Sequence, residues 1–503
     1  MRRLAPLVLI CALAGCATVR PTRGPAPARL GADSTVAITI LHVNDVYEIT
    51  PMENGRSGGL ARLATLRKRL LAETPHVVTV LPGDFYSPSA LGTARVDGKA
   101  LAGRQMVAVL NLLGLDAVTF GNHEFDLSET DFRARVAESR FAYVASNVTG
   151  ADGQPFPGTA RHRVLTFASP YGPVRVGLVS ATINSTLKPY VRYSDPIEGL
   201  RREAAAVRDS VQAIVALTHL AIAQDIVAAT EVPALDLVLG GHEHENVRLY
   251  RGADFTPILK ADANGRTAYV HRLRIHPRRG LVSVASELVV ITEAIPDDAA
   301  VAAEVQRWVE MAYAGFRAAG FEPTSHVATL PVPLEGRESA TRNTDTNLGG
   351  LIAEAFYHEA AARGGADLAL FNTGSIRLDD VLAAGPITEY DVIRVLPFGG
   401  NVVTADVRGA TLDSVLTQGV ANRGSGGWLQ HYGVTREGGA WRINGAPIDP
   451  ARTYQVATSD FLVSGRETGL GYFSPRNPNV RLTATHRDVR RAVIEELQRR
   501  YSQ

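Results

Sequence analysis

The chain has almost no cysteine. Of its 503 residues only two are cysteines, Cys11 and Cys16, and both lie close to the N-terminus. The rest of the sequence therefore offers no disulfide framework and no cysteine-ligated metal site. Any metal held by that part must take nitrogen and oxygen donors, which histidine, aspartate and asparagine can supply.

An excess of charge is also missing. The formal net charge is +1, from 52 basic and 51 acidic residues, so the sequence shows no electrostatic footprint for nucleic acid. Lysine is scarce, because only Lys68, Lys99, Lys188 and Lys260 are lysines and the other basic residues are arginines. In a chain so rich in arginine, a single arginine is weak evidence for a binding role.

The apolar run near the N-terminus, residues 4–13, is too short to span a bilayer. It follows Met1-Arg2-Arg3 and leads into Leu13-Ala14-Gly15-Cys16, which resembles the signal peptide of a bacterial lipoprotein. We therefore expect cleavage after residue 15, a lipid on Cys16 and a flexible, proline-rich tether over residues 16–34. Ala17 after the cysteine resembles lipoproteins sorted to an outer membrane, which implies a cell-envelope protein facing the periplasm.

The remaining composition is that of a globular protein, with 45% hydrophobic and 20% charged residues. Short apolar runs alternate with helical patterns up to about residue 293, which indicates an α/β domain. The runs cover residues 36–43, 77–81, 117–120, 141–145, 174–180, 214–217 and 235–239.

A single amphipathic helix is predicted over residues 297–316, with Val301, Val305, Trp308 and Phe316 on one stripe. We interpret it as a connector between two domains. The predicted division is a first domain at 35–296, a connecting helix at 297–324 and a second domain at 325–503.

Polar motifs follow five of the apolar runs. They supply Asp45, Asp84, Asn122 with His123, His219, and His242 with His244, in chain order. A lone polar residue at such a place is usually a cap or a satisfied core residue, but the carboxyl ends of strands in an α/β sheet gather at one cleft. This mixture of carboxylate, carboxamide and imidazole suits two first-row metal ions about 3.5–4 Å apart that share a carboxylate.

The ordered set resembles the signature of the calcineurin-like metallophosphoesterases and, within them, the bacterial 5'-nucleotidase and UDP-sugar hydrolase family. The resemblance implies a β-sandwich flanked by helices, a linker helix and a mixed α/β substrate-binding domain. It also implies two divalent metal ions, drawn from zinc, manganese, magnesium, cobalt and iron. By position, Asp84 bridges the ions, Asp45 and His244 bind the first, and Asn122, His219 and His242 bind the second.

His123 matches the catalytic histidine of that family, and Asp126 matches the carboxylate that orients it. Two cations make water nucleophilic near neutral pH and neutralise phosphoryl charge. His123 is then expected to stabilise the transition state or protonate the leaving alkoxide, while Asp126 fixes its tautomer.

Tyr47 departs from the family pattern, which has a histidine ligand of the first ion at this place. A neutral phenol is a poor ligand because it must lose a proton of pKa near 10. Three roles stay open: a bystander with water in the vacancy, which we favour, a weak first site, or a phenolate that binds a trivalent ion.

The second domain carries motifs that resemble the family's nucleotide-binding segments. Arg337 and Arg342 match its two-arginine segment, and Asn372 to Arg377 match its Asn-Gly-Gly-x-Ile-Arg loop. Guanidinium groups suit phosphate oxygens because they donate in pairs. Two aromatic residues, Phe398 and Phe461, match the pair that sandwiches the base, since stacking needs flat area.

Glu467 stands where the family has an aspartate for the ribose hydroxyls. Its neighbour is Arg466, so preference for nucleotides is the least specific part of the resemblance.

We expect hydrolysis of phosphate monoesters, foremost nucleoside 5'-monophosphates. The alternatives are a 2',3'-cyclic nucleotide phosphodiesterase or nucleotide-sugar pyrophosphatase and, from another class, a nucleotide-binding lipoprotein with weak or no turnover. No partner other than the small-molecule substrate and the membrane is indicated, and the sequence does not fix the oligomeric state.

Overall fold

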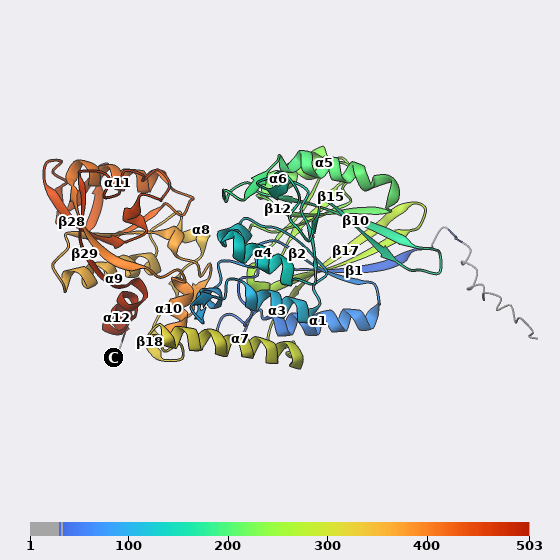
Figure 1. The fold of residues 1–503 in the computed structure, drawn as a ribbon, viewed down its shortest axis with the longest axis horizontal. Helices are drawn as coiled ribbons and strands as arrows, with labels where there is room; N and C mark the ends of the chain where they lie inside the picture. The colour runs from blue at the N-terminus through green and yellow to red at the C-terminus, as the bar shows by residue number, and fades with distance from the viewer. Residues whose placement is uncertain (1–29, 32–33, 502–503) are drawn as a thin grey trace, which may run out of the picture.

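The computed structural model describes residues 30–31 and 34–501. The predicted signal peptide, Cys16 and most of the predicted tether therefore lie outside the described residues. Among the described helices, none combines the length and the apolar character needed to cross a membrane. The described chain forms two lobes, with the first half of the sequence in one lobe and the last third in the other (Figure 1).

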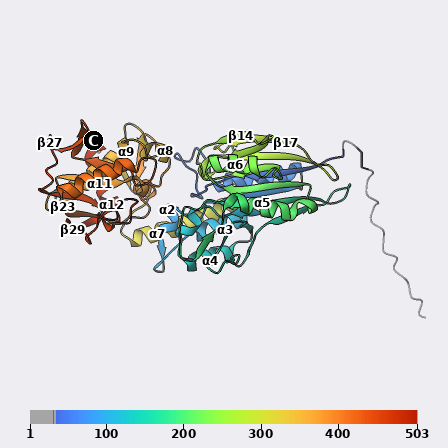
Figure 2. The same ribbon diagram turned by 90° about the horizontal axis from the view of Figure 1, so that it is seen from above.

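The first lobe is a sandwich of two β-sheets, which lie one above the other in Figure 1; Figure 2 looks onto this stack from above. One sheet has seven strands in the order β17-β16-β1-β2-β5-β6-β8, with the bounds β17 Gly280–Val290, β16 Thr267–His276, β1 Val36–His42, β2 Val77–Pro82, β5 Ala117–Thr119, β6 Ala142–Val144 and β8 Thr159–Ala160. The other has six in the order β14-β15-β13-β12-β10-β9, with the bounds β14 Val247–Arg251, β15 Thr256–Lys260, β13 Leu237–Gly240, β12 Ala213–His219, β10 Val174–Thr182 and β9 Arg163–Phe167.

A buried apolar layer joins the two sheets. It includes Ile38 and Val80 from the seven-stranded sheet and Leu178, Leu217 and Leu239 from the six-stranded sheet. Strands β1, β2 and β5 run parallel to one another, as do β10, β12 and β13. Carboxyl ends of strands from both sheets are thus available to one edge of the sandwich.

Helices cover both outer faces. The apolar cluster on the seven-stranded sheet contains residues of α1 Leu60–Glu73, α2 Ala90–Thr93, α3 Arg104–Leu113, α4 Glu129–Glu138 and α7 Ala299–Ala318. The cluster on the six-stranded sheet contains residues of α5 Pro196–Val207 and α6 Ile222–Glu231. The mixed α/β sandwich flanked by helices is the fold expected from the sequence.

Helix α7 is the predicted amphipathic connector, shifted by two residues. It begins after Asp298, whose side chain accepts a hydrogen bond from the Val301 amide. Val305, Trp308 and Phe316 are buried, and the helix runs beneath α1 and α3 (Figure 1). Its apolar stripe thus packs on the first lobe along most of its length.

The second lobe is built on a five-stranded sheet in the order β24-β20-β28-β23-β29, with the bounds β24 Leu429–Tyr432, β20 Leu368–Asn372, β28 Thr453–Ser459, β23 Asn401–Arg408 and β29 Val480–Asp488. Helices α9 Asn347–Ala361 and α12 Val489–Tyr501 share one apolar cluster with this sheet, and α11 Gly409–Ala421 belongs to another. Two short helices, α8 Glu338–Thr341 and α10 Glu389–Val395, lie between the sheet and the first lobe (Figure 1).

Short strand pairs complete the two lobes. They are β3 Arg95–Val96 with β4 Lys99–Ala100, β7 Val148–Gly150 with β11 Val191–Tyr193, β18 His326–Leu330 with β22 Gly385–Thr388, β19 Leu334–Glu335 with β21 Val381–Leu382, and the three-stranded β25 Val434–Glu437, β26 Ala440–Ile443 and β27 Ala446–Pro447.

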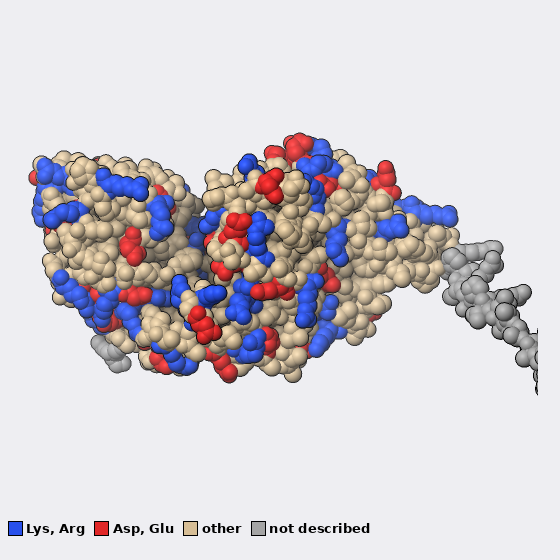
Figure 3. Space-filling model, viewed as in Figure 1, with Lys and Arg blue, Asp and Glu red and all other residues tan. Residues whose placement is uncertain are grey.

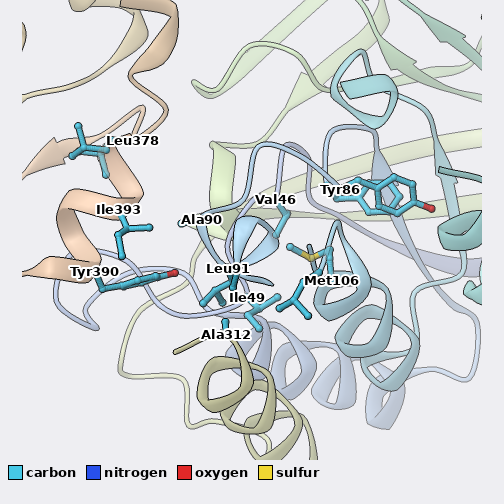
Figure 4. Close-up of a cluster of buried hydrophobic side chains, with 14 of the residues drawn as sticks. Val46, Ile49, Tyr86, Ala90, Leu91, Met106, Ala312, Leu378, Tyr390 and Ile393 are labelled. Carbon is cyan, nitrogen blue, oxygen red and sulfur yellow. The ribbon is translucent and has the colours of Figure 1, made fainter. Parts of the chain in front are cut away.

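Apolar side chains also join the two lobes. In Figure 4, Tyr390 and Ile393 of α10 approach Ala90 and Leu91 of α2, with Ala312 of α7 beside them. The Tyr390 hydroxyl donates to the Glu48 carboxylate at 3.4 Å. The face in Figure 3 carries acidic and basic side chains interspersed, and a cleft separates the lobes above this contact.

Candidate metal centre and active site

The predicted ligands meet where the two sheets of the sandwich share an edge. Loops after β1, β2 and β5 bring Asp45, Asp84 and Asn122, and β12 and the loop after β13 bring His219, His242 and His244. The ligand atoms of Asp45, Asp84 and His219 all lie within 4.8 Å of one another. The cluster expected from the sequence therefore forms, with donors from both sheets.

Three of the proposed ligands have a strained backbone conformation. Asp45, Asp84 and His242 adopt positive φ angles of 52°, 59° and 85°. Such conformations cost free energy and concentrate at functional sites. A Cβ on Gly121 would lie 2.0 Å from Oδ1 of Asp84, so only glycine allows this close approach of loops.

The carboxylates at the centre are buried and lack a lysine or arginine partner among the described ion pairs. Asp45 is 0% exposed and Asp84 is 1% exposed. Oδ2 of Asp84 lies 3.2 Å from Nε2 of His219, which in turn lies 3.2 Å from Oδ1 of Asn122. Buried carboxylates are costly unless a cation compensates them, so this donor set fits bound metal ions.

The pKa values of the groups around the buried carboxylates are also shifted in the direction that places positive charge beside them. Burial alone would lower the pKa of His219, but the charges of Asp84 and Asp45 raise it to about 9. Likewise, burial would raise the pKa of Asp84, but the charges of His219 and His123 hold it well below its usual range. Burial and the charge of His219 lower the pKa of His242 to about 3, so this imidazole keeps its neutral, metal-binding form.

Hydrogen bonds aim the imidazoles at the carboxylates. Nδ1 of His219 donates to the carbonyl oxygen of Pro82 at 2.9 Å, which leaves Nε2 as the free donor atom toward Asp84. Nδ1 of His244 is bonded to the Asp379 carboxylate, and Nε2 faces Oδ1 of Asp45 at 3.6 Å. Fixing the second nitrogen in this way orients a histidine ligand.

Tyr47 lies inside the ligand cluster. Its hydroxyl oxygen is 3.1 Å from Oδ2 of Asp84, 3.4 Å from Oδ1 of Asp45 and 3.1 Å from Nε2 of His244. Burial raises the pKa of Tyr47 well above its usual value, and the charges of Asp84 and Asp45 raise it further.

His123 and Asp126 form the expected pair. They begin and end the short 3₁₀ helix η1 His123–Asp126, and Nδ1 of His123 lies 2.7 Å from Oδ2 of Asp126. The His123 amide also donates to Oδ1 of Asp84 at 2.8 Å. Burial works against protonation, but the Asp84 and Asp126 charges raise the pKa of His123 above its ordinary value.

Several residues that support the site were not predicted from the sequence. The Glu124 carboxylate is fully buried and accepts from the backbone amides of Asp84, Phe85, Tyr86 and Gly121 at 2.6–3.1 Å. It therefore binds two metal-site loops together. Its place directly after His123 was a signal, but nothing in the spacing showed which amides it holds.

A buried ion pair supports the loop of His242 and His244. The Lys260 ammonium bonds to Glu243, which lies between the two histidines, and reaches Asp225 at 2.7 Å. Asp379, from the second lobe, was also missed because its partner His244 is distant in sequence.

A cavity of about 900 Å³ opens beside this cluster. It is lined from the first lobe by Asp84, Asn122, His123, His242 and His244, and from the second by Arg342, Asn372, Arg377, Phe398, Phe461 and Glu467. The structure thus joins six of the seven predicted substrate-binding residues to the predicted metal ligands.

Two arginines frame the second-lobe wall of this cavity. Arg342 is paired with Glu338, and Arg377 lies 3.6 Å from the same carboxylate. The buried Nε atoms of Arg342 and Arg377 have no hydrogen-bond partner within the described part of the chain. The guanidinium groups of these two cavity-lining residues suit an anionic ligand.

Aromatic and amide groups of the second lobe also line the cavity. Phe398 is 56% exposed, and the Arg377 guanidinium lies 5.6 Å from its ring centre. The Asn372 amide donates to the Glu467 carboxylate at 2.9 Å, so Glu467 is held in the pocket wall.

Arg337 is the predicted residue that does not line this cavity. It is exposed, pairs with Glu335 and borders a separate cavity of about 320 Å³ with His244 and Asp379. It is near the metal cluster but outside the larger pocket.

Comparison with known proteins agrees with this geometry. Residues 38–246 match the calcineurin-like phosphoesterase family, and residues 326–473 match the 5'-nucleotidase C-terminal domain. The snake venom 5'-nucleotidase of Gloydius brevicauda is 25% identical over 86% of this chain and 82% of its own. Protein UshA of Yersinia enterocolitica is 26% identical over 88% of this chain and 87% of its own.

Solved structures share the fold. A 5'-nucleotidase precursor from Thermus thermophilus superposes with a TM-score of 0.76 at 22% identity, over 93% of this chain and 97% of that one. A sulfate thiohydrolase, SoxB, gives a TM-score of 0.67 at 14% identity, over 92% and 94% of the two chains. Because proteins with different names share this fold, the reaction must be argued from the site. With its two-metal donor set and both family matches, the chain belongs to the calcineurin-like metallophosphoesterases that carry a 5'-nucleotidase C-terminal domain.

Proposed function

We propose that this metal-dependent phosphoric ester hydrolase acts on nucleoside 5'-monophosphates. The observation that carries the proposal is the shared cavity, in which Asp84 and His123 of the first lobe face a wall containing Arg377, Phe398 and Phe461 of the second. A phosphate near the carboxylates and a flat base near the phenylalanines fit the two ends of this space.

The proposed ligands of the first ion are Asp45, Asp84 and His244, and those of the second are Asp84, Asn122, His219 and His242. When bound, two cations there make water nucleophilic near neutral pH and neutralise phosphoryl charge.

His123 is the proposed acid. With Nδ1 held by Asp126 at 2.7 Å, its Nε2 is the nitrogen left to donate a proton to the departing ribose oxygen. Asp126 fixes this tautomer and stabilises the positive charge of the ring.

Second-lobe groups hold the rest of the substrate. Arg342 and Arg377 donate to phosphate oxygens through their guanidinium groups, while the Phe398 and Phe461 rings stack on the base. Asn372 and Glu467 bind polar atoms of the nucleoside, and Glu467 faces the ribose hydroxyls. Arg337 contributes at the edge of the phosphate region.

Release of inorganic phosphate from a panel of esters, with and without added manganese or zinc, tests this function. The panel contains nucleoside 5'-monophosphates, 2',3'-cyclic nucleotides, nucleotide sugars and a simple phosphate monoester. Preferential cleavage of the 5'-monophosphates supports the proposal. Preference for cyclic nucleotides or nucleotide sugars would replace it, and nucleotide binding without turnover under any metal would indicate a binding protein.

The base-stacking role has its own control. Phe398→Ala removes a ring expected to contribute about 1–3 kcal/mol, so KM for a nucleotide should rise by about 5- to 150-fold. Phe255→Ala removes another exposed ring, in the turn between β14 and β15 outside the cavity, and should leave KM unchanged.

We also propose that the mature chain begins at a lipidated Cys16 and lies in the cell envelope, on the outer membrane facing the periplasm. The support is the sequence around Cys16 alone. Replacing it by Cys16→Ser should abolish labelling by radioactive palmitate and release the protein from membranes, and labelling that persists would refute the anchor.

A further inference from the structure

The hydroxyl of Tyr47 lies within hydrogen-bond distance of three side chains that are proposed metal ligands. Its oxygen lies 3.1 Å from Oδ2 of Asp84, 3.4 Å from Oδ1 of Asp45 and 3.1 Å from Nε2 of His244. Nε2 of His244 and Oδ1 of Asp45 are 3.6 Å apart.

These separations match donor atoms that surround one ion. With metal–ligand bonds of about 2.0–2.2 Å, neighbouring donors lie about 2.8 Å apart in an octahedron and up to about 3.6 Å apart in a tetrahedron. We propose that the Tyr47 oxygen is a ligand of the first metal ion, together with Asp45, Asp84 and His244. The inference rests on the metal-dependent site of the proposed function.

The fold holds the phenol ring in this position. Tyr47 is 7% exposed, and its amide donates to Oδ1 of Asn264 at 3.0 Å. The ring meets the His244 ring edge-on, with centroids 5.5 Å apart, and the His123 ring in the same manner at 6.3 Å. With contacts on two sides, the oxygen is directed at the carboxylates.

Binding converts the phenol to a phenolate. The O–H bond breaks, an oxygen–metal bond forms and one proton passes to solvent, with no change of oxidation state. The first site then has three anionic donors, Asp45, Asp84 and Tyr47, whereas the second has Asp84 with the neutral Asn122, His219 and His242.

The difference in charge predicts a difference in ion. Coulomb attraction grows with the charge of the ion, so the more anionic site gains more from a trivalent ion. The first site therefore prefers a ferric ion, while the second keeps a divalent ion such as zinc.

Absorption spectroscopy of metal-stripped protein tests the ligand directly. One equivalent of ferric ion followed by one of zinc should give two ions per chain and a visible phenolate-to-iron charge-transfer band. In Tyr47→Phe the band should be absent and the affinity for ferric ion should fall by about 100-fold or more. This loss exceeds the one expected for a residue that only hydrogen-bonds to a metal ligand. Zinc at the second site should be retained.

Tyr190→Phe is the matched control. It removes another buried hydroxyl of the same lobe, one that donates to the Leu127 carbonyl at 3.0 Å, and should leave the band intact. Tyr47→His keeps a ligand at the position, so it should bind a divalent ion there without any band, even if Tyr47→Phe folds poorly.

Three results would overturn the assignment: a bound ferric ion without the band, the same band in Tyr47→Phe or Tyr47→His, or no ferric binding by the parent protein. Phosphate release is measured in parallel. A Tyr47-dependent band in protein that cleaves none of the esters would refute the proposed function while leaving the ligand assignment intact.

Discussion

The two halves of the proposed metal centre are supported by different parts of the chain. The proposed ligands of the second ion all lie at the ends of strands of the sandwich; they are Asn122, His219 and His242. His219 is oriented from within the same lobe, because its Nδ1 lies 2.9 Å from the carbonyl oxygen of Pro82. The first-ion donor His244 is oriented by Asp379, a side chain of the second lobe. One half is thus a property of the sandwich alone, and the other depends on the contact between lobes.

This difference has a consequence for function. The residue that orients His244 follows closely on Arg377, which lines the substrate cavity. The wall of the substrate cavity and the orientation of a first-site ligand therefore depend on one short segment.

The largest expected effect comes from the carboxylate that both halves share. Asp84→Asn removes one of the two buried negative charges, so both ions should be lost and kcat should fall by about 10³-fold or more. Metal content and phosphate release measured on the same preparation check this. Retention of two ions would show that Asp84 is not the bridge.

His123→Ala tests whether chemistry can be separated from metal binding. The change removes a general acid, worth about 10²- to 10⁴-fold in kcat, but removes no proposed metal ligand. Elemental analysis should still find two ions per chain. Asp126→Asn, which keeps the shape of the side chain, should cost less, about 10- to 100-fold.

Asp379→Asn addresses the dependence on the second lobe. Loss of the carboxylate beside Nδ1 of His244 should weaken the first site by about 10- to 100-fold and leave the second unchanged. Titration of stripped protein with metal resolves the two affinities. Equal weakening of both sites would mean that Asp379 supports the fold in general and not the first ion.

The smallest expected effect concerns the contact between lobes. Tyr390→Phe keeps the ring but removes the bond to Glu48, so unfolding free energy should fall by about 0.5–1.5 kcal/mol. First-site affinity should drop at most a few-fold, measured beside the second-site affinity. A large loss of affinity at the second site would show that this site, too, depends on the contact between the lobes.

The sequence pointed to proposed ligands of both ions, but it left the role of Tyr47 open and gave no sign of Asp379, and both of these residues belong to the first half. Strand ends are local features, so Asp45, Asp84, Asn122 and His219 could be located from apolar runs followed by polar residues. The sandwich fold was expected from resemblance, and the structure bears it out. That the donors come from two facing sheets could not be read from spacing.

Contacts between distant segments account for what was missed. Asp379 meets His244 across 135 positions of sequence, and Glu124 meets the amides after β2 across about 40. Neither pairing leaves a periodic signal. The role of Tyr47 was left open because a departure from a motif shows what is missing and not where the new side chain goes.

Anomalous diffraction from crystals of the native protein, recorded at the iron, zinc and manganese edges, would identify the ion at each site. We expect two peaks on opposite sides of Asp84, with iron on the side of Tyr47 and a divalent metal beside Asn122 and His219. A single peak, or an ion pair from which the Tyr47 oxygen is turned away, would contradict this expectation.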